Sequence, residues 1–415
     1  MKAAVRPEHH LLAVEHEHDV NCMFELAVPA VEATGDRPPL HIALVIDRSG
    51  SMAGEKLTHA CRCAAWLGER LRPTDELSLV TFDDEVRLLL PRTPVDATRL
   101  TAALASVRPG GTTNLSGGWL KGLEQLRSSP ADATRRILLL TDGMANVGIT
   151  NGGTLAALPR RARADGVGTT TIGFGAGFDE DLLTAMADSG GGDAHWAETP
   201  DMAPEIFAKE FDGLTRLCAQ NVSVEIRPSA EVEVLGILNE YPQVAVPGGV
   251  QISLGDAYGG ETRNVVFQLH VPHLVELGAV QVAGLILRYV TVGDEVATHE
   301  VTVPLVVNAV SAADAAAAAA DPEVRRQVLV LTAARARDEA IRMTDRGDAG
   351  SARRALRLAA RTLRETAALD PGTAQAATLQ AALLDDEASD LARGPMTPQQ
   401  RKRMRYDSTR RRRGR

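Results

Sequence analysis

The sequence predicts a multidomain protein: an α/β domain with a doubly wound sheet, an all-β sandwich and a C-terminal α-helical bundle. Residues 38–217 alternate apolar strands with helices, which is typical of a parallel sheet covered on both faces. Residues 218–310 show strand patterns without a helix, and residues 321–393 show helical patterns. A chain of 415 residues is also too long for one ordinary domain.

The central domain is expected to begin with a buried strand at 40–47, followed by a helix over about 54–71. Strands at 76–82 and 86–93 then flank Asp83 and Asp84, which we expect to make a tight turn rather than to serve as extra ligands, because Asp side chains can hydrogen-bond the nearby backbone. The later strands are expected at 136–141, 169–174 and 195–197, and the later helices at 114–127, 154–164, 179–188 and 203–217.

The β-rich region follows the central domain and has a counterpart at the N-terminus. Apolar and polar residues alternate after Cys218, and two strands flank a predicted turn at Gly293 and Asp294. Residues 11–28 also alternate but have no helix to pack against. We therefore expect residues 8–34 and 218–310 to form one β-sandwich, with the central domain inserted between its strands.

The last part of the chain is predicted to be a small helical bundle and a tail. Asp321 and Pro322 form a helix start, and a second helix covers about 351–368. Asp370 begins a third helix that continues towards Leu391. Residues 394–415 contain nine basic residues and one acid, so we expect a disordered tail there.

Composition limits where the protein works. The net charge is −9 although the tail is basic, and only 3% of the residues are aromatic, so nucleic acid is not expected as a partner. The N-terminus lacks the apolar core of a secretory signal, and no apolar run is long enough to span a membrane. The four cysteines show no disulfide spacing. These features predict a cytoplasmic protein.

A candidate metal site follows the first buried strand. Asp47 supplies a carboxylate there, and Ser49 and Ser51 supply neutral oxygens at alternate positions. A glycine-rich loop at 109–115 and a second strand that ends at Asp142 add further oxygen ligands. Loops that follow parallel strands meet at one edge of a sheet, which is where such sheets bind ligands. Hard divalent cations prefer oxygen ligands of this kind.

These motifs closely resemble the von Willebrand factor type A (VWA) domain, with its metal-ion-dependent adhesion site, in its bacterial form. Asp47, Ser49 and Ser51 match the first motif of the family, and Asp142 matches the acid of the third. Thr113 matches the threonine of the second loop, with Thr112 as the alternative by register. The resemblance covers about residues 38–216 and implies a Rossmann-like fold.

The resemblance also implies a function. In such domains the serines usually bind Mg²⁺ directly, the acids act largely through waters, and the threonine joins in the ligand-bound state. A Glu or Asp of a protein partner then completes the octahedral coordination. Mn²⁺ would fit the same oxygen atoms. We therefore expect a divalent-metal-dependent protein-interaction module and no enzyme, with no catalytic residues and with an ATPase-driven assembly as the alternative context.

Other motifs predict less. His9, His10, His16 and His18 lack the spacing of a zinc site and fit a solvated strand face better. Residues 173–177 are rich in glycine but lack the lysine of a phosphate-binding loop. His195 has no paired nucleophile motif, and a hydrolase using a metal-bound water would need a base that no motif near the loops supplies.

Overall fold

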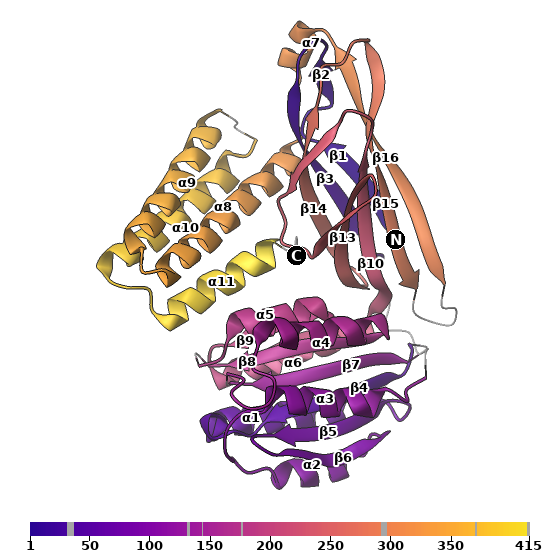
Figure 1. The fold of residues 1–415 in the computed structure, drawn as a ribbon, viewed down its shortest axis with the longest axis vertical. Helices are drawn as coiled ribbons and strands as arrows, with labels where there is room; N and C mark the ends of the chain where they lie inside the picture. Colours follow the sequence, from indigo (N-terminus) through magenta and orange to yellow (C-terminus); the bar gives the residue numbers. More distant parts are fainter. Residues whose placement is uncertain are drawn as a thin grey trace.

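The computed structural model describes residues 1–30, 37–130, 133–142, 144–175, 177–291, 297–369 and 372–412. Figure 1 shows an α/β domain at one end of the molecule, a pair of packed sheets at the other, and a group of helices beside both. The turn predicted at Gly293 and Asp294 and the helix start predicted at Asp370 lie outside the described residues.

The α/β domain contains a sheet in the order β6-β5-β4-β7-β8-β9. All neighbouring strands in it are parallel except β6, which pairs with β5 in the antiparallel direction. The strands are β4 (Leu40–Asp47), β5 (Glu76–Phe82), β6 (Val86–Pro94), β7 (Thr134–Thr141), β8 (Val167–Phe174) and β9 (Gly191–Ala197). The predicted doubly wound, Rossmann-like fold is therefore correct for this domain.

Helices cover both faces of this sheet because β4 alternates its apolar side chains between two cores. Ile42, Leu44 and Ile46 pack against α1 (Glu55–Gly68), α2 (Ala97–Ala105) and α6 (Ala203–Thr215). Ala43 and Val45 pack against α3 (Leu115–Leu126), α4 (Gly152–Ala164) and α5 (Glu180–Ser189). The short helices η1 (Gly50–Met52) and η2 (Pro200–Met202) precede α1 and α6. Helix α2, which begins after the N-cap Asp96, was not predicted from the sequence.

Two further sheets combine strands from before and after the α/β domain. One has the order β1-β3-β14-β11 and the other the order β12-β13-β10-β15-β16-β2. The N-terminal strands are β1 (Lys2–Pro7), β2 (Leu11–Ala13) and β3 (His18–Ala27). The later strands are β10 (Leu217–Pro228), β11 (Glu233–Ile237), β12 (Gln243–Val246), β13 (Gly249–Tyr258), β14 (Thr262–Val271), β15 (Gly278–Thr291) and β16 (Thr298–Val310).

These two sheets bury one common hydrophobic core. Phe24 of β3 and Phe267 of β14 lie in it together with Val224 of β10 and Leu285 of β15. Strand β3 pairs with β14 over ten residue pairs, from Thr262 with Ala27 to Val271 with His18. The chain thus leaves this core after β3 and returns to it at β10. Strand pairing begins at Lys2, which precedes the N-terminal boundary expected at residue 8.

The helices after β16 are α7 (Ala312–Ala317), α8 (Pro322–Asp345), α9 (Ala349–Leu369), α10 (Ala374–Arg393) and α11 (Pro398–Arg412). Helix α7 contacts β2 of the second sheet, whereas the other four pack on one another and, through α8, on the first sheet. Helices α8, α9 and α10 share a core of alanine and leucine side chains. Val324 and Leu331 of α8 pack on Met23 and Val266, which lie on β3 and β14. No described helix is long and apolar enough to cross a membrane.

The expectation of a disordered tail is wrong for residues 398–412, which form helix α11. Figure 1 shows this helix between the other helices and the α/β domain. Its basic side chains form ion pairs with acidic side chains of α5 and α8. Arg405 pairs with Asp181 at 3.1 Å and with Asp338 at 3.2 Å. Lys402 is buried and pairs with Glu180 at 2.6 Å. The charge run looked solvated because its partners lie up to 224 residues away in the sequence.

Candidate metal-binding edge of the α/β domain

The predicted ligand residues lie on loops that leave the carboxyl ends of neighbouring strands. Strands β4 and β7 are parallel and in register, with Ile46 opposite Leu140. Asp47 is the last residue of β4, and Asp142 directly follows β7. Because neighbouring parallel strands end at the same edge, the acids and the loops after them come together there.

The first loop holds its polar groups in a defined order. Asp47 is fully buried, and its Oδ1 accepts a hydrogen bond from the backbone N–H of Ser49 at 2.7 Å. Thr141 donates its hydroxyl to the other oxygen of Asp47. Burial raises the pKa of Asp47, and the hydrogen bonds from Thr141 and Ser49 oppose that shift. The carboxylate is therefore fixed in place by β7 and by its own loop.

A chain of hydrogen bonds connects the first loop with the third. The hydroxyl oxygens of Ser49 and Ser51 lie 3.1 Å apart. Ser51 donates to Oδ1 of Asp142 at 2.7 Å, and therefore Ser49 acts as the donor to Ser51. Asp47 joins this chain because it accepts the N–H of Ser49. Four of the predicted ligands therefore lie in one hydrogen-bonded cluster: Asp47, Ser49, Ser51 and Asp142.

The second loop is held against the first by backbone contacts. The N–H of Gly110 donates to the carbonyl of Arg48 at 2.7 Å, and the N–H of Gly50 donates to the carbonyl of Gly111 at 2.9 Å. Asp83 accepts from Arg48 at 2.7 Å and from the N–H of Gly111 at 3.1 Å. A Cβ on Gly110 would lie 1.7 Å from an oxygen of Asp83, so only glycine fits there.

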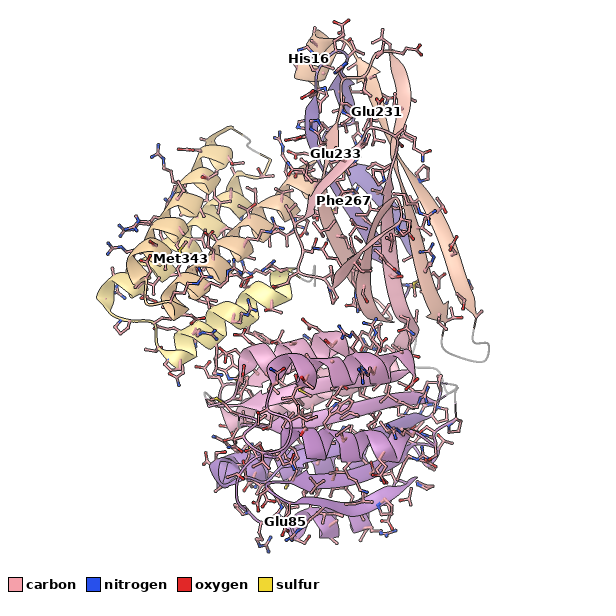
Figure 2. All side chains as sticks on the ribbon, in the orientation of Figure 1. His16, Glu85, Glu231, Glu233, Phe267 and Met343 are labelled. Carbon is pink, nitrogen blue, oxygen red and sulfur yellow. The ribbon has the colours of Figure 1, made fainter. Side chains whose placement is uncertain are left out.

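Asp83 consequently braces two loops. The same residue makes the turn expected from the sequence, since its carboxylate also accepts from the N–H of Glu85 at 2.9 Å. Figure 2 labels Glu85 and His16, which lie at opposite ends of the molecule.

Thr113 is placed by a residue that the sequence analysis did not select. The N–H of Thr113 donates to Oδ1 of Asn146 at 2.8 Å, and the carbonyl of Thr113 accepts from the N–H groups of Asn146 and Val147 at 3.2 Å each. Thr113 is buried whereas Thr112 is exposed. The signal that could have selected Asn146 is the Ala-Asn-Val-Gly sequence at 145–148, which follows the third loop.

Lys56 is a second residue that the sequence analysis missed. It lies in the first turn of α1, and its ammonium group contacts Oδ2 of Asp142 and the carbonyl oxygen of Ser51, the latter at 3.3 Å. Asp142 therefore presents Oδ1 towards the serines while Lys56 holds Oδ2. Carboxylates and hydroxyls are the hard oxygen ligands that Mg²⁺ requires, so the residues at this edge fit such an ion.

The histidines considered from the sequence lie apart from this edge, whereas the glycine-rich turn after β8 adjoins it, since a Cβ on Gly175 would lie 3.3 Å from Cε of Lys56. His16 contacts the carbonyl of Val14, and His18 contacts that of Ala13, both at 2.9 Å. Gly175 has a φ of +68° in the turn that ends β8, and Asp179 caps α5. These groups have local structural roles.

Comparison with known proteins identifies the domain. Residues 41–209 match the model of the von Willebrand factor type A domain. The α/β part of the chain is therefore a VWA domain, a type that generally serves in protein interaction or adhesion.

The similarity to known proteins extends beyond this domain. Protein sll0103 of Synechocystis is 26% identical over 61% of this chain and 64% of its own length. YfbK of Escherichia coli is 27% identical over 56% of this chain and 42% of its own length. The chain thus spans less than two thirds of these relatives. A solved structure of a von Willebrand factor type A protein from Catenulispora acidiphila covers 94% of this chain and 88% of its own, with a TM-score of 0.71 and 15% identity, so the likeness in fold includes the flanking parts.

Proposed function

We propose that the VWA domain binds Mg²⁺ through Asp47, Ser49, Ser51, Thr113 and Asp142, as a metal-ion-dependent adhesion site that receives a Glu or Asp of a protein partner. The observation that supports this most is the hydrogen-bonded chain from Ser49 through Ser51 to Asp142, which connects two loops through oxygen atoms alone. Mn²⁺ would use the same ligands. The bound ion would supply a local positive charge with a position open to the partner's carboxylate.

The residues around the five ligands have supporting roles in this proposal. Thr141 and the N–H of Ser49 hold Asp47, which cannot turn away from the edge. Asn146 fixes the backbone of Thr113. The hydroxyl of Thr113 is the group we assign to the ion in the partner-bound state. Lys56 neutralises part of the charge of Asp142. This lowers the repulsion that a partner's carboxylate would meet when it binds close to Asp47 and Asp142.

The first experiment measures the ion alone. We expect Mn²⁺, followed by electron paramagnetic resonance, to bind the full chain and Mg²⁺ to displace it. Ser49→Ala combined with Ser51→Ala should weaken Mn²⁺ binding more than tenfold, because two direct ligands are lost. Asp84→Asn is the control, since Asp84 lies beside the same edge without belonging to the five. Equal Mn²⁺ affinity in the double variant and the wild type would refute the assignment.

The second experiment tests the partner. Immobilised full chain is used to capture proteins in the presence of Mg²⁺ or excess chelator, and Asp142→Ala is compared with Asp84→Asn. The proposal requires capture that needs both Mg²⁺ and Asp142, followed by loss of binding when the partner's acidic residue is replaced. Capture unchanged by chelator contradicts it. A component of an ATPase-driven assembly is the partner class for which we would look first.

We also propose a domain organisation and a location. Residues 8–34 and 218–310 would form one β-sandwich interrupted by the VWA domain at 38–217, and residues 321–393 a helical bundle. The shared core of the two sheets supports the first assignment. The four cysteines, all described, are free, which favours a cytoplasmic location. The pairing of α11 with acidic side chains argues against nucleic acid as its partner.

A further inference from the structure

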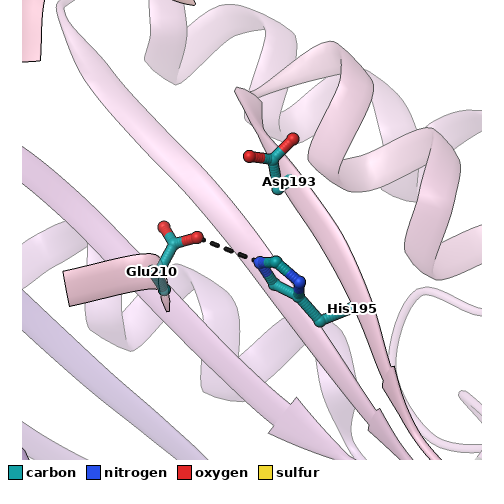
Figure 3. A group of neighbouring side chains, drawn as sticks. All are labelled: Asp193, His195 and Glu210. Carbon is teal, nitrogen blue, oxygen red and sulfur yellow. Dashed lines mark hydrogen bonds and ion pairs between the residues drawn. The ribbon is translucent and has the colours of Figure 1, made fainter. Parts of the chain in front are cut away.

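Three side chains that can bind a metal lie together where α6 packs on the edge strand of the VWA sheet, away from the loops described above. Asp193 and His195 are two residues apart on β9, and Glu210 is on α6. Figure 3 shows the three side chains together, with a dashed line between Glu210 and His195. The nitrogen of His195 and one carboxylate oxygen from each acid all lie within 4.8 Å of one another.

The spacing of these atoms suits a small divalent ion. Nε2 of His195 is 3.1 Å from Oε2 of Glu210. A zinc ion bonds nitrogen and oxygen ligands at about 2.0–2.2 Å, and tetrahedral ligands therefore lie roughly 3.4 Å from one another. His195 and Glu210 already meet this condition. The oxygen of Asp193 lies within 4.8 Å of the other two ligand atoms, and its side chain would have to move closer to bind the same ion.

Glu210 is held in position from behind. Thr170, which is fully buried on β8, donates its hydroxyl to Oε1 of Glu210 at 2.6 Å. His195 is 8% and Glu210 7% exposed, so both heads lie in a partly dry environment. Metal-binding side chains usually have such a hydrogen-bonding partner, which fixes the direction in which they point. Oε2 of Glu210 is thereby directed at His195.

A cavity gives access to the three groups. Its volume is about 780 Å³, and its lining includes Asp193, His195 and Glu210. Tyr258 of β13 and Lys402 of α11 line it as well, so the three parts of the molecule meet there. Three protein ligands beside an open cavity leave room for water or a small anion as the fourth ligand, the arrangement of zinc sites that act on a ligand.

The two acids favour a cation beside them. The buried guanidinium of Arg136 interacts electrostatically with Glu210 and Asp193, but it donates hydrogen bonds to Asp256 at 2.9 Å and to the hydroxyl of Tyr258 at 3.1 Å. A mixed set of nitrogen and oxygen ligands favours Zn²⁺ and its neighbours over Mg²⁺.

We propose that Asp193, His195 and Glu210 form a second metal site, which binds a divalent transition metal of the Zn²⁺ type. The site is separate from the Mg²⁺ edge proposed above, because its residues lie on β9 and α6. It also differs from that edge in containing a nitrogen ligand. Its metal would strengthen the attachment of α6 to the edge strand and present an open coordination position to the cavity.

The test uses Co²⁺, whose visible absorption reports nitrogen and oxygen coordination. The full chain with Asp142→Ala serves as the background, so that the other proposed site does not contribute. We expect this protein to bind one Co²⁺ with visible bands that Zn²⁺ abolishes. Adding His195→Asn should weaken Co²⁺ binding more than tenfold, and Thr170→Val about tenfold or more, because it frees Glu210.

The control is His270→Asn in the same background. His270 also pairs with one carboxylate, Asp19 at 2.8 Å, but its pair is exposed and lies on other strands. Its replacement should leave Co²⁺ binding unchanged. Circular dichroism verifies folding, and Asp193→Asn replaces His195→Asn if the latter unfolds.

Two results would overturn the proposal. One is a background protein that binds no Co²⁺, and the other is equal Co²⁺ binding with and without His195. Either would leave His195 and Glu210 as a hydrogen-bonded structural pair. Neither result would affect the Mn²⁺ experiment on Ser49 and Ser51, so the two proposals fail separately.

Discussion

Replacing Asp256 with alanine should destabilise the VWA domain strongly, because the buried charge of Arg136 would lose its ion-pair partner where the VWA domain contacts β13. Arg136 of β7 is 1% exposed, and its guanidinium donates to Asp256 of β13 at 2.9 Å. Removing one partner of a buried ion pair costs about 3–5 kcal/mol. The hydroxyl of Tyr258 keeps its hydrogen bond to Arg136 at 3.1 Å, so we expect about 3 kcal/mol.

The assay is urea unfolding followed by tryptophan fluorescence. All three tryptophans, Trp66, Trp119 and Trp196, lie in the VWA domain, so the signal reports this domain. The unfolding free energy follows from linear extrapolation. Arg136→Met with Asp256→Leu removes both charges and should be closer to the wild type than Asp256→Ala is. A loss below about 1 kcal/mol for Asp256→Ala, or a double variant that is less stable than the single one, would refute the reasoning.

Three further predictions concern single contacts. Asp321→Ala should cost about 0.5–2 kcal/mol of unfolding free energy, because the carboxylate caps α8 through two backbone N–H groups at 2.9 and 3.0 Å. Gly122→Ala should cost about 1–3 kcal/mol, since its Cβ would lie 2.6 Å from a valine carbon of β4, whereas Gly152→Ala, with no atom closer than 3.9 Å, should change urea unfolding little. The hydrogen bond from Asp19 raises the pKa of His270, so Asp19→Asn should return it towards 6.5 in an NMR titration, and an unchanged value would contradict the pairing. The stability that His270 contributes is therefore present below pH 6.5 and lost as the pH rises through its raised pKa.

Much of the VWA domain could be predicted because its signals are local. An apolar strand such as 40–47 must be buried, and an acid that ends it must lie at the edge of the sheet. The sequence therefore indicated the strands of this sheet and the residues Asp47 and Asp142. Helix α2 was missed because it is short and its apolar stripe contains only Leu100 and Leu104 as buried residues.

The supporting residues of the candidate site could not be selected from the sequence. Lys56 and Asn146 are common residue types in a helix and a loop, and their roles depend on contacts with Asp142 and Thr113. Asp83 looked like a turn residue, which it is, but its contact with Arg48 also joins two loops. Such contacts arise from chain segments that meet only after folding.

By itself, the sequence determined the type of the central domain, the edge at which its loops meet and the oxygen-bearing residues placed there. These follow from hydrophobic periodicity and from short motifs, which act over a few residues. Only the tertiary structure decided that the basic C-terminal segment is the helix α11, and that Asp193, His195 and Glu210 adjoin one cavity. Charge pairing and burial between segments far apart in the chain depend on three-dimensional packing, which no local pattern records.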